Sequence, residues 1–237
     1  MAADNLQARN SCRKMLRAIK DSLEQLKSPS ISSADLRHLD LTMLRSIHRK
    51  LILSPIITLS LMSHLFEIAE NLGWYLNQYF QNCTLPNQDL NPPGSFYVDF
   101  GNFKFGKLMD ISKEPGWQVQ ATWNIARSTV PHMKVLVYSG IIGNRDELFR
   151  GELLAIIDVM CRWLNTKSLR LHIIAPVLLF SVVGMHHIRV LEAYFNGKEL
   201  VVRATELYDL EHQNHKLLIQ LSKWWLGHAS EMSTQEY

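Results

Sequence analysis

Apolar side chains recur at intervals of three and four residues near the start of the chain, which is the period of an amphipathic helix. This first stripe consists of Cys12, Leu16, Ile19, Leu23 and Leu26. The dipeptide Ser28-Pro29 should end the helix, because the residue before a proline avoids the α conformation. We expect the stripe to pack on the protein's own domain, with a partner helix as the alternative.

A second helix is predicted beyond Pro29, because Ser32 and Asp35 have the spacing of a helix capping box. Its apolar positions would be Leu36, Leu39, Met43, Ile47 and Leu51. These positions again lie three or four residues apart, so we expect the helix to reach about residue 51.

The segment 51–66 is almost entirely apolar and follows the basic residues Arg45, Arg49 and Lys50, a pattern typical of membrane segments. It ends at Glu67, which makes it shorter than the roughly 20 residues that span a bilayer. We therefore predict a buried core helix that starts near Pro55. Membrane association through residues 51–66 is the alternative.

Residues 84–95 are rich in Asn, Pro and Gly, a composition typical of a linker or a long loop. Beyond them, apolar and polar residues alternate with the period of two that half-buried strands show. The alternating segments are 96–100 and 117–123, and 134–139 gives a third, short strand. A helix should then open at Asp146.

The following part of the chain has the same order of elements. The segment 176–183 is a nearly continuous apolar run, as expected of a strand covered on both faces. Two further strands, 188–195 and 200–207, flank Asn196-Gly197, a dipeptide typical of β-hairpin turns. A last helix is predicted from about Glu211 to Leu226.

Together these elements predict an α+β fold. An N-terminal helical region (1–83) and a linker or loop (84–95) precede an α+β domain (96–227), and a flexible tail (228–237) follows. The domain should contain a mainly antiparallel sheet with two packed helices, in the order β-β-β-α-β-β-β-α. We expect the helices on one face of the sheet, because tight turns join most of its strands.

The composition is that of a globular protein. The 237 residues are 47% hydrophobic and carry a net charge of +3, which excludes a disordered chain or a disulfide-stapled module. This charge is too small to favour nucleic acid as a partner. The three cysteines are isolated, and residues 1–20 lack the apolar run of a secretory signal, so we expect a cytoplasmic or nuclear protein.

Carboxylates and histidines around the last strands form a candidate hydrolytic site. The helix with Glu152 precedes three strands, of which the second carries Glu192, an order similar to part of the PD-(D/E)XK nuclease core. Clustered carboxylates of this kind hold magnesium, and His186 and His187 lie in the preceding connection. The Glu-x-Lys of such nucleases is absent, so a metal-dependent hydrolase with a degenerate core is an alternative function. Otherwise Glu152 would serve the first turn of its helix through the helix dipole.

His212 and His215 form a second, metal-binding candidate, because their spacing on the last predicted helix can direct two imidazoles toward zinc. A solvated polar face is the competing interpretation. Residues 101–107 match the spacing of a phosphate loop, but Leu108 stands where that loop needs Ser or Thr. The sequence therefore indicates no cofactor and no cofactor-binding residue.

Three longer segments carry a resemblance to a known family. They are FRGELLAIIDVM (149–160), HIIAPVLLFSVVG (172–184) and RVLEAYFNGKELVVRATELYDL (189–210), and KWWLG follows them. The region 94–227 resembles a family of uncharacterised fungal intracellular proteins. This resemblance implies a fold maintained as a unit, and it brings no activity, cofactor or catalytic residue.

These observations favour a non-catalytic binding or accessory module. Neighbouring positions of the sequence supply no complete set of nucleophile, base and oxyanion donor, or of metal ligands. We expect protein partners, bound through the N-terminal helices.

Overall fold

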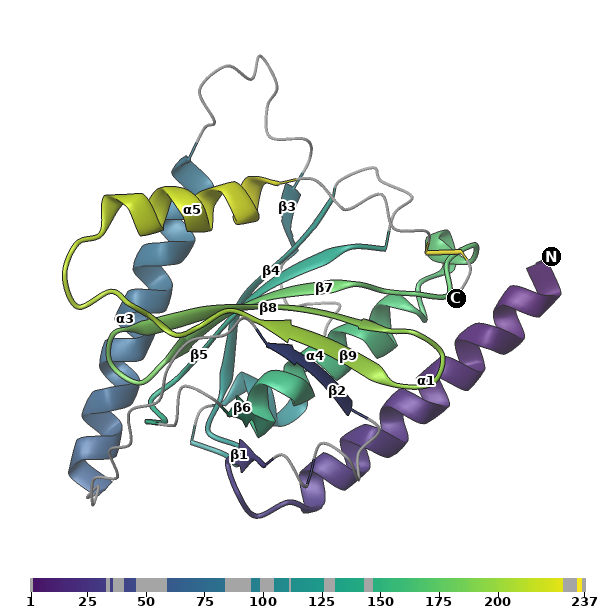
Figure 1. The fold of residues 1–237 in the computed structure, drawn as a ribbon, viewed down its shortest axis with the longest axis horizontal. Coiled ribbons are helices and arrows are strands. Elements are labelled where there is room, and N and C mark those ends of the chain that lie inside the picture. Colours follow the sequence, from purple (N-terminus) through teal and green to yellow (C-terminus); the bar gives the residue numbers. More distant parts are fainter. Residues whose placement is uncertain are drawn as a thin grey trace.

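The computed structural model describes residues 2–32, 35, 41–45, 59–83, 95–98, 105–110, 112–125, 131–142, 147–227 and 234–235 (Figure 1). Its helices are α1 (Ala2–Gln25), α3 (Leu59–Asn82), α4 (Arg150–Trp163) and α5 (His215–Leu226), with the short 3-10 helices η2 (Gly106–Met109) and η3 (Lys167–Leu169). Its strands are β1 (Ser30–Ile31), β2 (Leu41–Arg45), β3 (Ser95–Val98), β4 (Gln118–Ile125), β5 (Met133–Ser139), β6 (Leu148–Phe149), β7 (Val177–Val183), β8 (His187–Phe195), β9 (Leu200–Ala204) and β10 (Tyr208–Asp209).

Most strands join one mixed sheet in the order β2-β9-β8-β7-β5-β4-β3, with β10 paired to β8. The pairs β2–β9 and β5–β7 are parallel, whereas the other neighbours in this order are antiparallel. β1 and β6 form a separate antiparallel pair. Helices combined with a mainly antiparallel sheet confirm the predicted α+β class.

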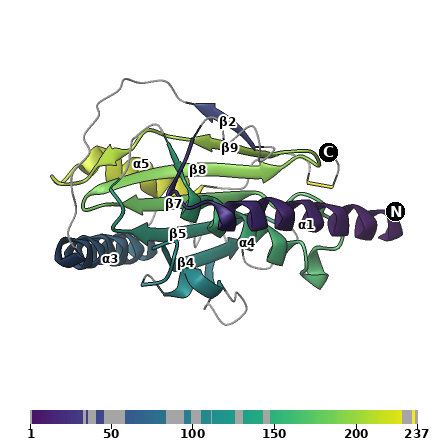
Figure 2. The ribbon, with the colours of Figure 1, turned by 90° about the horizontal axis from the view of Figure 1, so that it is seen from below.

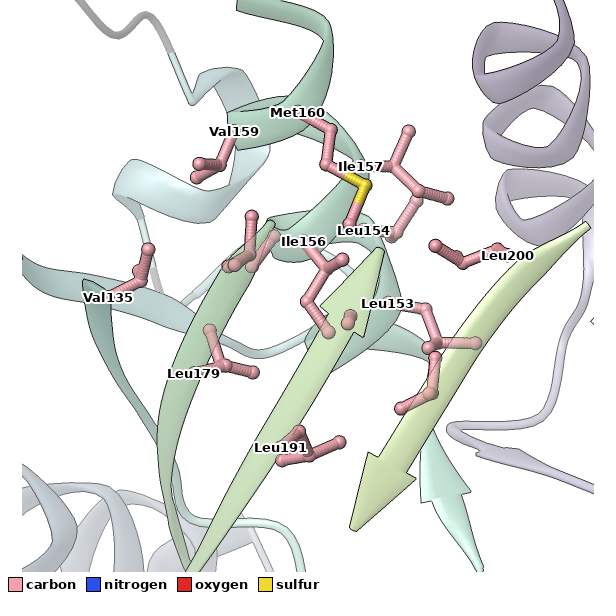
Figure 3. Packing of buried hydrophobic residues seen from close by; sticks show 14 of the residues in the cluster. Val135, Leu153, Leu154, Ile156, Ile157, Val159, Met160, Leu179, Leu191 and Leu200 are labelled. Atoms are coloured by element: carbon pink, nitrogen blue, oxygen red, sulfur yellow. The ribbon is translucent and has the colours of Figure 1, made fainter. Parts of the chain in front are cut away.

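Helices cover both faces of the sheet, so the expectation of one covered face is wrong. α1 and α4, which lie side by side (Figure 2), share a core with Val135 and Leu179 of the sheet (Figure 3). α3 and α5 share the opposite core with Leu136 and Phe180. Successive residues of β5 and β7 thus point into different cores. This confirms that 176–183 is apolar because its strand is covered on both faces.

The helix predicted after Ser32 is wrong for residues 41–45, which form β2. The predicted capping contact is present, since the Ser32 N–H donates to Asp35 Oδ2 (2.8 Å) and the Asp35 N–H donates to Ser32 Oγ (3.2 Å). β2 nevertheless pairs in parallel with residues 200–204 of β9. Without β2 the backbone groups of β9 would form an open sheet edge, and pairing with them overrides the local helical pattern.

Two helix starts also differ from their predictions. α4 begins at Arg150 and not at Asp146, because Leu148–Phe149 pairs with β1. α5 begins at His215 and not at Glu211, and Asn214 caps it by accepting a hydrogen bond from the Leu217 N–H (3.1 Å). Pairing and capping set these ends, and a hydrophobic period does not locate them.

The hairpin predicted at Asn196-Gly197 is confirmed. β8 and β9 are antiparallel, and Gly197 has a φ of 94°, in the left-handed region that favours glycine. Asn196 Oδ1 accepts hydrogen bonds from the N–H groups of Lys198 and Glu199, both at 3.0 Å. The side chain of Asn196 therefore holds the turn as well.

The N-terminal stripe is buried within the chain, which confirms that it packs on the protein's own domain. Its buried members are Cys12, Leu16, Ile19 and Leu23. Arg9 fixes α1 in place, because its guanidinium donates to the backbone oxygens of Leu164 (2.9 Å), Thr166 (3.1 Å) and Leu169 (2.6 Å). The first of these carbonyls lies at the end of α4, where a helix leaves such groups unpaired.

Several predictions lie outside the described residues. They concern the helical positions 36–40 and 46–51, the helix start near Pro55, the loop at 84–94 and most of the tail from residue 228. The domain boundaries placed there stay predictions. Residues 59–66 of the apolar segment belong to α3, in which Leu65 is buried.

Candidate functional site

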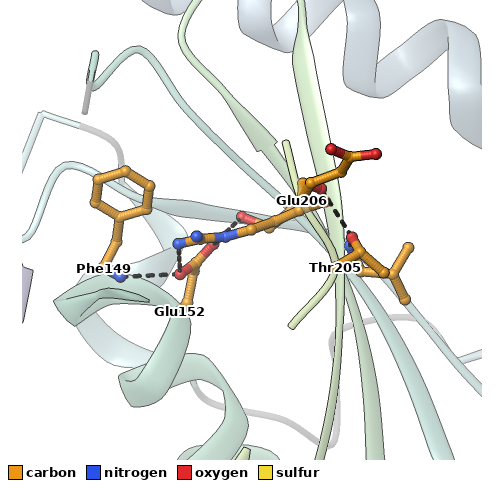
Figure 4. Close-up of polar contacts among 7 residues, drawn as sticks. Phe149, Glu152, Thr205 and Glu206 are labelled. Carbon is orange, nitrogen blue, oxygen red and sulfur yellow. Dashed lines mark hydrogen bonds and ion pairs between the residues drawn. The ribbon is translucent and has the colours of Figure 1, made fainter. Parts of the chain in front are cut away.

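Glu152, the first catalytic candidate, is fully buried between α4 and the sheet. Its Oε1 accepts hydrogen bonds from Ser181 Oγ (2.6 Å) and Arg189 Nε (2.8 Å). Its Oε2 accepts from Arg189 Nη2 (2.5 Å) and from the backbone N–H of Phe149 (2.9 Å), as Figure 4 shows. Phe149 is the N-cap of α4, so the carboxylate also caps the helix.

This network makes Glu152 the counter-ion of a buried arginine. Arg189 is fully buried as well, and its Nε and Nη2 bind both carboxylate oxygens in the bidentate geometry that makes such pairs strong. Its guanidinium also lies over the Phe149 ring, 4.8 Å from the centroid. The position of Glu152 in the first turn of α4 agrees with the structural interpretation of the sequence. A carboxylate held in this way is not positioned to bind a metal ion or a substrate.

The structure does not bring Glu192 to Glu152. Glu192 and Arg189 are three residues apart on β8, and neighbouring strand residues point to opposite faces. Arg189 faces Glu152, so Glu192 faces the other side of the sheet, where it forms an ion pair with Arg203 (3.1 Å). The two carboxylates of the hydrolase hypothesis therefore lie on different sides of the sheet.

The two histidines of that hypothesis lie at the turn between β7 and β8. The carbonyl of His186 accepts a hydrogen bond from the Leu210 N–H (2.7 Å). His187 is the first residue of β8 and pairs with Val183 of β7. Ser181 and Arg189, which bind Glu152, lie opposite each other on these same strands, two pairs further from the turn.

His212 and His215 are both exposed. His215 is the first residue of α5, whereas His212 precedes the helix, so the helical spacing assumed for the pair does not apply. Among the described residues, no group of three or more His, Cys, Asp or Glu side chains could hold a metal ion. Within the part of the chain that the structure describes, His212 and His215 therefore have no third ligand for a zinc site.

A cleft of about 230 Å³ lies along α4, between α1 and residues 105–108 and 114–115. α4 lines it with Arg150, Leu154, Asp158 and Arg162, which are four residues apart and therefore share one face of the helix. α1 adds Lys20 and Glu24. The cleft is thus built on the two helices that Arg9 and the α1 stripe fix together.

Ion pairs connect the walls of this cleft. Lys20 Nζ lies 2.6 Å from Asp158 Oδ1, and burial raises the pKa of Asp158 against the opposing effect of Lys20. Arg150 pairs with Glu114, whose side chain is 81% exposed. Of the charged lining side chains, four are cationic (Lys20, Lys107, Arg150, Arg162) and three anionic (Glu24, Glu114, Asp158), a net charge of 4 − 3 = +1.

A second group of ionisable side chains lies at the end of the sheet below α5. Lys134 Nζ donates to the backbone oxygens of Trp225 and Gly227, the latter at 2.8 Å, and burial lowers the pKa of Lys134 to about 8. His132 is two residues earlier, and burial lowers its pKa to about 4. Neither ring nitrogen of His132 has a hydrogen-bond partner among the described residues.

The sequence patterns do not reveal the cleft or the residues that line it. Arg150, Leu154, Asp158 and Arg162 are a visible i, i+4 series, but such a series on a helix usually marks a solvated face. Glu114, Lys107 and Lys20 are far from them in sequence. Only the packing of α1 and of residues 105–108 and 114–115 against α4 turns this face into a concave site.

Comparisons of this protein with family models, with curated proteins and with solved structures found no match. Within the described residues, no helix combines the length and the apolar character that crossing a membrane requires.

Proposed function

We propose that this protein is a non-catalytic binding module that holds a small ligand in the cleft between α1, α4 and residues 105–108 and 114–115. The observation that carries the proposal is the convergence of charged side chains, among them the nearly buried Arg150, on a concave site of about 230 Å³. A hollow with a few convergent polar groups is the usual form of a ligand site. The strongest catalytic candidate, Glu152, is instead held by the core.

The walls of the cleft are held in place by contacts outside it. Arg9 ties α1 to the end of α4, and the buried α1 stripe packs into the same core as α4. A site whose walls are already ordered loses less conformational freedom when a ligand binds. This supports binding as the role of the cleft.

The test is thermal unfolding of the full chain against small organic acids, amines, nucleotides and divalent metal ions. A ligand at about 100 times its dissociation constant should stabilise the protein by roughly 2.7 kcal/mol, a shift of several degrees. Hydrogen exchange should then show protection in residues 105–110 and 150–162. If no compound raises the melting temperature, or if protection lies elsewhere, the proposal is wrong; turnover of the bound compound would contradict its non-catalytic part.

A matched pair of variants locates the effect. Lys107→Ala removes an exposed cation from the cleft, and Lys216→Ala removes one from α5. We expect the first to weaken binding of the stabilising compound and the second to leave it unchanged. Equal effects would place the ligand outside the cleft.

Protein docking on α3 is a second candidate function, and it retains the predicted protein partner. The α1 stripe is covered by α4, but α3 exposes Trp74 (56%) and Tyr75 (48%) next to each other. Exposed Trp and Tyr side chains are frequent anchors of protein interfaces. Glu67 and Glu70 are exposed on the preceding turns, which favours a basic partner surface.

The docking proposal is tested by affinity capture from cells that express the Trp74→Ser variant. Trp224→Ser is not a suitable control, because Trp224 packs against the core. The better control is Ile219→Ser, an exposed apolar residue on α5. A partner lost with Trp74→Ser and kept with Ile219→Ser supports docking on α3. Capture that is insensitive to Trp74 contradicts it.

We further propose that the module belongs to a reducing compartment, the cytoplasm or the nucleus. Cys12, Cys83 and Cys161 form no disulfide bond, and burial raises the pKa of Cys161 to about 11. Fractionation of cells that express the tagged full chain checks this placement, and recovery in a secreted or luminal fraction would contradict it.

A further inference from the structure

Arg150 lines the cleft, is only 6% exposed and has an incomplete set of partners. Its Nη1 donates to the backbone oxygen of Leu26, and its Nη2 donates to Oε2 of Glu114. Its Nε is buried and has no hydrogen-bond partner among the described residues. Native proteins leave few buried donors unpaired, because such a donor has lost its water without gaining a partner.

Arg189 shows the complete form of the same interaction in this protein. Its Nε and Nη2, which lie on one edge of the planar guanidinium, bind the two oxygens of Glu152. This edge of arginine matches the two oxygens of a carboxylate. On Arg150 the same edge is half used, because only Nη2 is bound.

Glu114 is an exposed ion-pair partner of Arg150, and another carboxylate could replace it. Its side chain is 81% exposed, whereas that of Arg150 is 7% exposed. An ion pair with one solvated partner contributes little, because water competes for the carboxylate. Another carboxylate that binds both Nε and Nη2 would replace Glu114 and leave it solvated.

We propose that Arg150 binds the carboxylate of a small organic acid in the cleft, at the place that Glu114 holds in this structure. This inference rests on the proposed binding function and names its ligand class. The carboxylate would take Nε and Nη2 together, as Glu152 does at Arg189. The body of the acid would lie along Leu154, which follows Arg150 by one helical turn on the same wall.

Size and charge both favour a small monocarboxylate. A volume of about 230 Å³ corresponds to roughly eight water molecules at liquid density, which is enough for a small acid. The lining has a net charge of +1 and includes Glu24 and Asp158. A single negative charge balances this lining, whereas a phosphate dianion would meet the two acidic side chains.

The experiment follows the Arg150 Nε–H resonance in the ¹⁵N-labelled full chain in a buffer free of carboxylates and phosphate. Arg150→Lys, which keeps the charge and loses the donor edge, assigns the resonance. The probes are benzoate, its neutral analogue benzamide, inorganic phosphate and a short acidic peptide. We expect benzoate to shift the resonance saturably and benzamide to leave it unmoved.

Glu114→Gln keeps the inference testable even if Arg150→Lys does not fold, because Glu114 is exposed. Removing this competing carboxylate should tighten benzoate binding roughly fivefold, the factor that corresponds to an exposed ion pair of about 1 kcal/mol. Glu211→Gln makes the same change of charge at an exposed site before α5 and should leave the affinity unchanged.

The outcomes separate this inference from the proposed function. If benzoate leaves Arg150 Nε–H unmoved while another class of compound protects the cleft, the carboxylate inference is wrong and the binding function stands. A response to phosphate or to the peptide alone overturns the small monocarboxylate. If no probe or panel compound protects the cleft, both proposals fail.

Discussion

Two arginine–glutamate pairs begin in the first turn of α4 and differ in burial. Glu152 and Arg189 are both buried, and both carboxylate oxygens and both edge nitrogens are used. Arg150 is nearly buried but its partner Glu114 is exposed, and one edge nitrogen has no partner among the described residues. The first pair is part of the core, whereas in the second pair the Arg150 Nε–H can still donate to a ligand. The difference shows that burial of both partners, and not the residue types, separates a structural pair from a candidate site.

The largest effect is expected from breaking the buried pair. Glu152→Ala leaves Arg189 charged and unpaired in the core, which should reduce the free energy of unfolding by about 3–5 kcal/mol in a urea titration. Glu192→Ala is the matched control, because its ion pair with Arg203 is half exposed, and its cost should stay below about 1 kcal/mol. Similar costs for the two variants would contradict the assignment of Glu152 to the core.

Gly151 lies between Arg150 and Glu152 in the first turn of α4, and a substitution there tests how closely this turn packs on Trp117. A Cβ at this residue would lie 2.1 Å from Cδ1 of Trp117, so in Gly151→Ala either α4 or the Trp117 ring must move. We expect a loss of about 1–3 kcal/mol, as for other overpacked cores. The control is Gly73→Ala in α3, where the nearest atom lies at 3.7 Å; the better helix propensity of alanine should stabilise that variant slightly.

The stability of the protein should also depend on pH through His132, which belongs to neither ion pair. His132 has an ordinary pKa of 6.5, and burial lowers it to about 4 in the folded protein. Between these values the unfolded chain binds a proton that the folded protein excludes, so stability falls as the pH drops from 6.5 toward 4. We expect a loss of roughly 2 kcal/mol across this range.

His132→Asn should reduce the loss in free energy of unfolding between pH 7 and pH 4.5, measured in urea titrations. The same substitution at the exposed His215 should not change this loss. If His132→Asn loses as much stability between these two pH values as the wild type, another group causes the pH dependence. The two pairs are best compared at about pH 8, where His132 is almost entirely neutral in both states.

The smallest change in stability is expected from Glu114→Gln. The exposed carboxylate gains little from Arg150, so the free energy of unfolding should change by less than about 1 kcal/mol. A loss as large as that of Glu152→Ala would show that Glu114 is a structural partner and would remove the difference between the two pairs. Urea unfolding of both variants in one buffer makes this measurement.

Much of the fold was predictable because its signals are local. The alternation in 117–123, the apolar run at 176–183 and the Asn196-Gly197 turn each report a conformation set by neighbouring residues. β2 was not predictable in this way, since Leu41–Arg45 fits a helical period and becomes a strand only beside β9. The same holds for the second covered face of the sheet, because sequence periodicity does not say which helix packs where.

Among the catalytic candidates, the sequence by itself placed Glu152 in an early turn of a helix, where the helix dipole favours a carboxylate. It did not identify Arg189 and Ser181 as its partners, or Glu114 and Leu26 as those of Arg150. The sheet order and the packing of α1 on α4 bring these residues together. The sequence determined the elements and their ends in part, and the tertiary structure decided which charges are buried. The physical reason is that helical and strand periods depend on neighbours in the chain, whereas desolvation depends on distant segments that cover a side chain.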